Sequence, residues 1–126
     1  MKINETKYFT VKEAEKTLPL VKQIVKDILS KGYQVRTISE SMGGEIKDNP
    51  EVQQYLDEIN DYIDELEEIG CHFKDWNFTI GLVDFPAIIN GDEVFLCWRS
   101  DEENIEFYHK VEEGYAGRKR IPNEYF

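Results

Sequence analysis

The clearest structural signal lies in residues 49–73, which read NPEVQQYLDEINDYIDELEEIGCHF. Asn49 is a good helix N-cap, and Pro50 at the first helical position loses no intrahelical hydrogen bond. Apolar side chains then recur in steps of three and four, as on one buried helix face: Val52, Tyr55, Ile59, Tyr62, Leu66 and Ile69. Gly70 stands where a left-handed C-cap is expected. The pattern therefore predicts a helix that ends at Gly70.

A second amphipathic pattern precedes this helix, between residues 10 and 41. Thr10 and Glu13 have the spacing of a capping box, and apolar side chains follow in steps of four and three: Ala14, Leu18, Val21, Val25 and Ile28. Pro19 predicts a kink in the early turns. Gly32 either ends the helix or allows close packing against a neighbouring element. We favour a long, bent helix to about residue 41.

The two predicted helices carry complementary charge. Residues 51–68 contain eight acidic side chains and no Lys or Arg, whereas the first helix carries six basic residues against four acidic ones. This favours an antiparallel hairpin, although each exposed ion pair contributes only ~0.2–1 kcal/mol. Two such helices rarely complete their burial alone, so the C-terminal half or a second copy of the chain must cover them.

From residue 71 onward the hydrophobic period changes to that of β-strands. Runs of β-branched and aromatic residues occupy positions 71–73, 79–84, 87–89, 93–98 and 105–109. Asn90-Gly91 is a strong two-residue hairpin signal, and Pro86 is expected at a strand start or a sheet edge. Residues 114–120 are typical of a loop with a basic end.

These patterns predict one α+β domain over residues 1–126. A long N-terminal helical hairpin (residues 10–70) is expected to pack on a small, mostly antiparallel sheet from the β-rich part (residues 71–126). The length of 126 residues fits a single domain whose core needs no metal or disulfide.

Composition excludes several functional classes. The 15 Lys+Arg against 26 Asp+Glu give a net charge of −11, which repels a phosphate backbone, so no nucleic-acid partner is expected. No apolar run approaches the ~20 residues of a membrane span, so we expect no membrane association. Two cysteines without an export signal predict reduced thiols in a cytoplasmic protein.

The sequence lacks the common catalytic and metal-binding signatures. It has no GxxxxGK phosphate loop, no zinc-finger spacing of Cys and His, and no GxSxG nucleophile elbow. Enzymatic activity is therefore left undecided, a non-catalytic role is favoured, and no cofactor is predicted.

One polar cluster in the β-rich part is a candidate binding site: Lys74, Asp75, Asp84, Arg99, His109 and Arg118. In a meander, Asp84, Arg99 and His109 would converge at one end of the sheet. Arg99 and Arg118 could then grip a carboxylate or phosphate. Alternatively, Asp84 and His109 could bind a metal ion or act as an acid–base pair. The third interpretation is structural, with Asp84 accepting backbone or arginine hydrogen bonds that lock a turn at residues 84–86.

Other reactive or aromatic residues have simpler interpretations. Cys97 on an apolar strand is expected to be a small buried filler. Cys71 and His72 are adjacent, so on a strand they point to opposite faces and cannot share an ion; His72 is expected at the surface. The aromatic residues Trp76, Phe78 and Trp98 are expected in the core, with Trp76 an alternative pocket residue.

The motifs of the chain resemble those of the domain-of-unknown-function 2203 family. The matching positions cover nearly the whole chain: Phe9, Thr10, Glu13, Ala14, Leu18, Pro19, GLVDFPA at 81–87, LCWR at 96–99, Glu102, Ile105, His109 and GYAGR at 114–118. Asp101 precedes Glu102 where the family has a Gly-Glu turn, and Tyr108 stands where it commonly has Trp. The resemblance implies a cytosolic, stand-alone prokaryotic protein with no established activity.

Two functional hypotheses follow from the sequence. The first is a non-catalytic binding or assembly module, a homodimer formed through the apolar faces of the two predicted helices. The second is a protein that binds a small molecule, an anion or a metal ion at Asp84, Arg99, His109 and Arg118, with an enzyme as one form of it. The second hypothesis requires Asp84 and His109 on the same face of the sheet.

Overall fold

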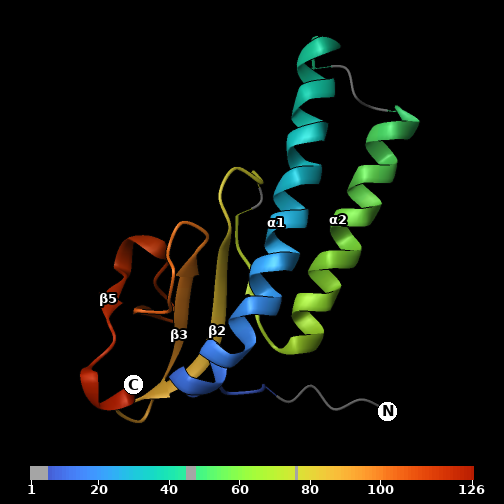
Figure 1. The fold of residues 1–126 in the computed structure, drawn as a ribbon. Helices are drawn as coiled ribbons and strands as arrows, with labels where there is room; N and C mark the ends of the chain where they lie inside the picture. The colour runs from blue at the N-terminus through green and yellow to red at the C-terminus, as the bar shows by residue number, and fades with distance from the viewer. Residues whose placement is uncertain (1–5, 45–47, 76) are drawn as a thin grey trace.

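The computed structural model describes residues 6–44, 48–75 and 77–126 of the chain. Two long helices, α1 (Val11–Ser41) and α2 (Pro50–Ile69), form a hairpin and are followed by an antiparallel sheet (Figure 1). Within the described residues the sheet has five strands in the order β1-β2-β3-β4-β5. Their bounds are β1 (His72–Phe73), β2 (Leu82–Ile89), β3 (Asp92–Arg99), β4 (Phe107–Lys110) and β5 (Lys119–Arg120). The α+β prediction is confirmed; the prediction for Trp76 lies outside the described residues.

The helix ends follow from the predicted capping residues. The Thr10 side chain accepts a hydrogen bond from the Glu13 amide, and the Glu13 side chain accepts one from the Thr10 amide. Asn49 accepts from the Val52 amide at 3.0 Å. Gly70 closes α2 with φ of 111°, a left-handed conformation that suits glycine.

Helix α1 continues through both residues that could have interrupted it. Pro19 lies inside α1, and Figure 1 shows the helix changing direction within its N-terminal turns. Gly32 is buried, and a Cβ built there would lie only 2.5 Å from the Cβ of Phe78. Of the two interpretations of Gly32, close packing is the correct one.

The two strands expected on either side of Pro86 are in fact one continuous strand, β2, and that part of the prediction is wrong. Pro86 lies opposite Phe95 of β3. Its carbonyl accepts a hydrogen bond from the Phe9 amide at 2.7 Å, so its backbone groups face away from β3. Since β1 pairs only with Val83 and Asp84, β2 is locally an edge at Pro86. The missing N–H therefore removes no hydrogen bond to β3.

The segment after β4 also differs from the prediction of a loop. It contains the short helix η1 (Tyr115–Gly117) and strand β5, and a second short helix, η2 (Asn123–Tyr125), follows. Strand β5 pairs with the β4 residues Phe107 and Tyr108.

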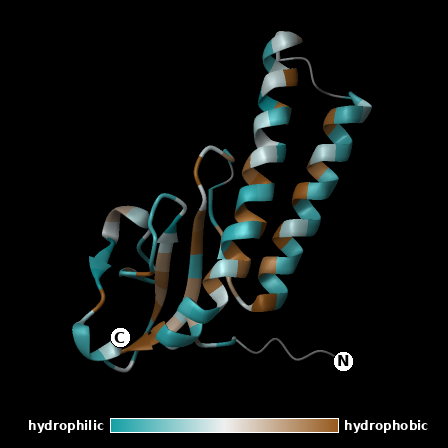
Figure 2. Ribbon diagram, viewed as in Figure 1, coloured by the Kyte–Doolittle hydropathy of each residue, from teal (hydrophilic) through white to brown (hydrophobic). Residues whose placement is uncertain are grey.

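One core joins the two halves of the molecule. Helix α1 lies between α2 and the sheet, and apolar residues are concentrated along β2 and β3 (Figures 1 and 2). The buried cluster combines α1 residues such as Val21 and Ile28 with Phe85, Leu96 and Trp98 of the sheet. The opposite face of the sheet is turned away from the helices and carries Asp84 and Cys97.

The described part of the helical hairpin leaves three large apolar side chains exposed: Leu20, Tyr33 and Met42. The structure contains a single chain, so association through the helices stays a prediction. In residues 6–44, 48–75 and 77–126, neither helix contains a segment long and apolar enough to cross a membrane.

Candidate functional site

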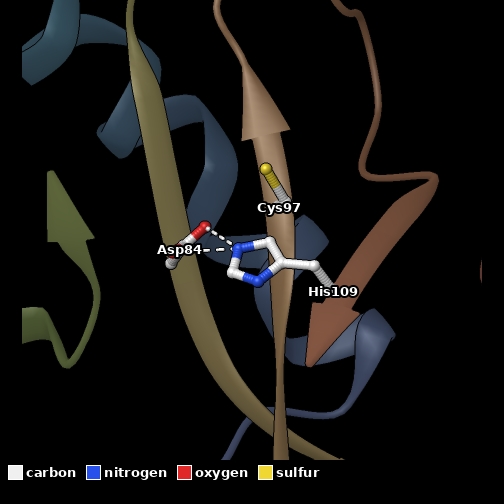
Figure 3. Close-up of side chains that lie close together, drawn as sticks. All are labelled: Asp84, Cys97 and His109. Carbon is white, nitrogen blue, oxygen red and sulfur yellow. Dashed lines mark hydrogen bonds and ion pairs between the residues drawn. The ribbon is translucent and has the colours of Figure 1, made fainter. Parts of the chain in front are cut away.

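Three neighbouring strands bring Asp84, Cys97 and His109 together on the face turned away from α1. Asp84 of β2 lies directly opposite Cys97 of β3, and His109 of β4 lies opposite Phe95. Phe95 and Cys97 are two residues apart, so all three side chains project from the same face. Figure 3 shows the imidazole reaching across β3 toward the Asp84 carboxylate, with the sulfur of Cys97 beside it.

The cluster is compact and shielded from solvent. One potential ligand atom from each residue lies within 4.8 Å of the other two. The relative exposures are 4% for Asp84, 2% for Cys97 and 4% for His109. His109 Nε2 lies 3.2 Å from each oxygen of the Asp84 carboxylate. The predicted convergence of Asp84 with His109 therefore agrees with the geometry, whereas Arg99, which was expected to join them, binds Asp101 instead.

Hydrogen bonding assigns the proton on one nitrogen of His109. Nδ1 lies 2.8 Å from the carbonyl oxygen of Lys110, which can only accept, so Nδ1 carries a proton and donates it. In a neutral ring, Nε2 then presents a lone pair toward the Asp84 carboxylate. Two acceptors at 3.2 Å need a cation between them, either a proton or a metal ion. A carbonyl that fixes Nδ1–H is also the usual partner of a metal-binding histidine.

Burial also changes the pKa values of the other two residues of the cluster, Asp84 and Cys97. Burial raises the pKa of Asp84 above its usual range, while the charge of His109, its hydrogen bond and the charge of Lys74 oppose the shift. Burial also raises the pKa of Cys97 to about 12. Without a metal ion the thiol is therefore protonated at neutral pH, and both nitrogens of His109 are already engaged. This arrangement does not support a cysteine nucleophile activated by a histidine base.

The two arginines of the predicted site are not paired as an anion-binding fork. Arg99 binds Asp101 through two nitrogens at 2.6 and 2.7 Å and also donates to the Tyr115 hydroxyl. Arg118 binds the Glu102 carboxylate at 2.6 and 2.8 Å. Each guanidinium is thus neutralised by its own carboxylate. Arg118 nevertheless donates to the carbonyl oxygen of Cys97 at 3.1 Å and so supports the backbone of the cluster.

Lys74 and Asp75 have different roles although they are adjacent. Asp75 is turned into its own loop, where it accepts hydrogen bonds from the amides of Asn77, Thr79 and Ile80. Lys74 lies with its ammonium 5.5 Å from the centre of the Phe95 ring, at the edge of the cluster. The predicted turn at residues 84–86 is wrong, because these residues lie inside β2 and Asp84 bonds to His109.

A pocket of about 290 Å³ opens beside the cluster. Asp84, Cys97 and His109 line it, and its remaining wall includes Lys74, Leu82, Phe95, Val111, Glu113 and Tyr115. Cys97 therefore has direct access to a cavity from a buried position, rather than being only a core filler.

Sequence reasoning missed Cys97 as a site residue, although a signal for it was present. The Asn90-Gly91 turn fixes the register of β2 and β3, with Ile89 opposite Asp92. Counting outward from this turn places Asp84 opposite Cys97 on one face. The potential ligand pair could have been found from the hairpin register alone.

The family model described as "Uncharacterized conserved protein (DUF2203)" matches residues 7–121. No curated protein and no solved structure matches this chain.

Proposed function

The chain belongs to the DUF2203 family of uncharacterised proteins, and we propose that it binds one divalent metal ion of the zinc type. The ligands are the Asp84 carboxylate, the Cys97 thiolate and Nε2 of His109. The observation that carries this proposal is the buried contact of His109 Nε2 with the Asp84 carboxylate at 3.2 Å, with the Cys97 thiol within 4.8 Å.

The donor set and its spacing favour zinc chemistry. Zn²⁺ binds imidazole nitrogen and carboxylate oxygen at about 2.0–2.2 Å and thiolate sulfur at about 2.3 Å. Ligand atoms around a tetrahedral ion are therefore about 3.3–3.8 Å apart. The distances of 3.2 Å between His109 and Asp84 and at most 4.8 Å within the cluster need only small side-chain movements.

The cluster also meets the electrostatic needs of a dication. Metal binding deprotonates a coordinating thiol outright, so the ion would displace the proton that Cys97 holds in the metal-free chain. The two anionic ligands neutralise the ion, and the Nδ1–H bond to Lys110 already orients His109. Three protein ligands leave one coordination position for water or another small ligand, as in catalytic rather than structural zinc sites.

Cobalt binding to the full chain tests this proposal. Co²⁺ is a spectroscopic substitute for Zn²⁺, and coordination by Cys97 should give thiolate charge-transfer absorption with one Co²⁺ per chain. Cys97→Ala should abolish this absorption, and Zn²⁺ should displace the cobalt from the wild type. We expect His109→Gln and Asp84→Asn to weaken Co²⁺ binding at least tenfold.

The chain supplies a matched control for each ligand. Cys71 is also buried, and His72 and Asp75 lie in the same half of the molecule, but none of the three belongs to the cluster. Cys71→Ala, His72→Gln and Asp75→Asn should retain the absorption band and the stoichiometry. The proposal is overturned if the wild type gives no thiolate band, or if Cys71→Ala loses it as Cys97→Ala does.

A further inference from the structure

The pocket beside the cluster has a definite chemical character. Leu82, Phe95 and Val111 give it apolar walls, and Lys74 is its only cationic side chain among the described residues. Its volume of about 290 Å³ is at the lower end of small-molecule sites. The pocket therefore suits a compact ligand with a short apolar body and a polar end near the metal ligands.

Charge selects the polar end of that ligand. A divalent ion with the Asp84 carboxylate, the Cys97 thiolate and neutral His109 has no net charge. The Lys74 ammonium adds one positive charge to the pocket that Asp84 also lines, with its nitrogen 5.5 Å from the centre of the Phe95 ring. The Glu113 carboxylate also lines the pocket and adds one negative charge, and it accepts a hydrogen bond from the Lys110 amide at 3.1 Å. An anionic group at the open metal position would therefore pair with Lys74 locally, while the charge of Glu113 disfavours a ligand with more than one negative charge.

The structure favours a carboxylate over a phosphate. Phosphate sites commonly use several backbone N–H groups or free arginines, whereas Arg99 and Arg118 are both bound by carboxylates. A single lysine and apolar walls match a monoanion with a hydrocarbon tail.

We propose that the Asp84–Cys97–His109 site binds a small organic monocarboxylate, with its carboxylate at the open metal position and near Lys74 and its apolar body against Leu82 and Phe95. This inference rests on the proposed metal site.

The experiment uses the full Co²⁺-loaded chain titrated separately with acetate, butanoate and inorganic phosphate. Carboxylate coordination should change the visible absorption of the cobalt. Each methylene buried against the apolar walls should tighten binding about fourfold, so butanoate should bind about fifteenfold more tightly than acetate. Phosphate should bind more weakly than butanoate.

Lys74→Met tests the charge partner, and Lys119→Met is its control. Lys119 is an exposed lysine of β5 outside the pocket, so its substitution changes the net charge of the chain equally. We expect Lys74→Met to weaken butanoate binding about tenfold without changing Co²⁺ stoichiometry or the thiolate band. Lys119→Met should have the butanoate affinity of the wild type.

The failure of this inference is distinguishable from that of the metal site. A chain that shows the thiolate band but no response to either carboxylate keeps the metal site and overturns the ligand. Equal losses in Lys74→Met and Lys119→Met, or tighter binding of phosphate than of butanoate, also overturn the ligand assignment. The absence of the thiolate band in the wild type overturns both proposals.

Discussion

Two aspartates nine residues apart show how the local surroundings decide what a carboxylate does. Asp84 is buried beside His109, and burial raises the pKa of its carboxyl. Partial burial acts on Asp75 in the same direction, but hydrogen bonds from the amides of Ile80, Asn77 and Thr79 outweigh it and lower the pKa of this carboxyl. Asp75 is therefore a structural anion that orders its loop, whereas Asp84 is the carboxylate that we propose as a metal ligand.

This contrast predicts a pH-dependent effect of Asp75→Asn. Because the folded-state pKa of Asp75 lies below its value in the unfolded chain, the carboxylate stabilises the fold above about pH 4. That contribution is lost as the pH falls through the folded-state pKa. We expect Asp75→Asn to lower the free energy of unfolding by about 1–2 kcal/mol at pH 7, and urea denaturation should show this difference shrinking as the pH falls below about 4.

Asp61→Asn on the exposed face of α2 serves as the control, and its small effect should not follow this pH profile. A difference between Asp75→Asn and the wild type that grew on acidification would contradict the assigned role of Asp75.

At the scale of elements, the sequence was most informative where structure depends on near neighbours. The caps at Thr10, Asn49 and Gly70 and the helical stripes are local patterns, and all appear in the structure. The sheet edge expected at Pro86 is confirmed, but the expected break between two strands is wrong. The Pro86 carbonyl accepts from the amide of the distant Phe9, a contact that no local pattern indicates. Convergence of Asp84 with His109 was predicted from the meander.

The isolation of Arg99 and Arg118 was not predictable in the same way. Asp101 and Glu102, two neighbouring residues in one turn, separate the arginines by binding one each. The sequence contains both acids, but their side-chain directions depend on the geometry of the turn and on where residues 115–118 return to the sheet. The sequence pattern therefore predicted that Asp84 and His109 lie together, but it did not predict the ion pairs of Arg99 and Arg118.

Gly32 gives the prediction that belongs to the helices. Helix propensity alone favours Gly32→Ala by about 1 kcal/mol. The added Cβ would meet Phe78 at 2.5 Å, so we expect overpacking to dominate and the substitution to lower the free energy of unfolding by about 1–3 kcal/mol. Ser30→Ala, at an exposed position of α1, should instead be neutral or slightly stabilising in the same urea denaturation experiment. A Gly32→Ala chain as stable as the wild type would rule out the tight contact between α1 and Phe78.

For the whole molecule, the position of the cluster links the metal site to overall stability. Asp84, Cys97 and His109 come from three adjacent strands, and the other face of the same strands contributes Phe85, Leu96 and Trp98 to the core shared with α1. We expect the two halves to unfold together because they share this core. A ligand that holds these strands together in the native state should then stabilise the helices along with the sheet.

Thermal unfolding with and without Zn²⁺ tests this coupling. At free Zn²⁺ a hundredfold above its dissociation constant, mass action adds about 2.7 kcal/mol to the free energy of unfolding. For a chain of 126 residues this corresponds to a rise in Tm of about 10 °C. We expect the same rise from helical circular dichroism and from tryptophan fluorescence, since both tryptophans lie in the C-terminal half. A chelator should reverse it.

Comparison of Cys97→Ala with Cys71→Ala distinguishes specific Zn²⁺ binding from weak association of Zn²⁺ with acidic side chains. Each variant is compared with itself, with and without Zn²⁺, so any change in its intrinsic stability cancels. Cys71→Ala should keep the rise in Tm and Cys97→Ala should lose it. If Cys97→Ala responds as strongly as the wild type, the ion is held elsewhere, for which the acidic surface of α2 offers the obvious place. If fluorescence shifts while helical dichroism does not, the hairpin and the sheet unfold separately and the shared core does not couple them.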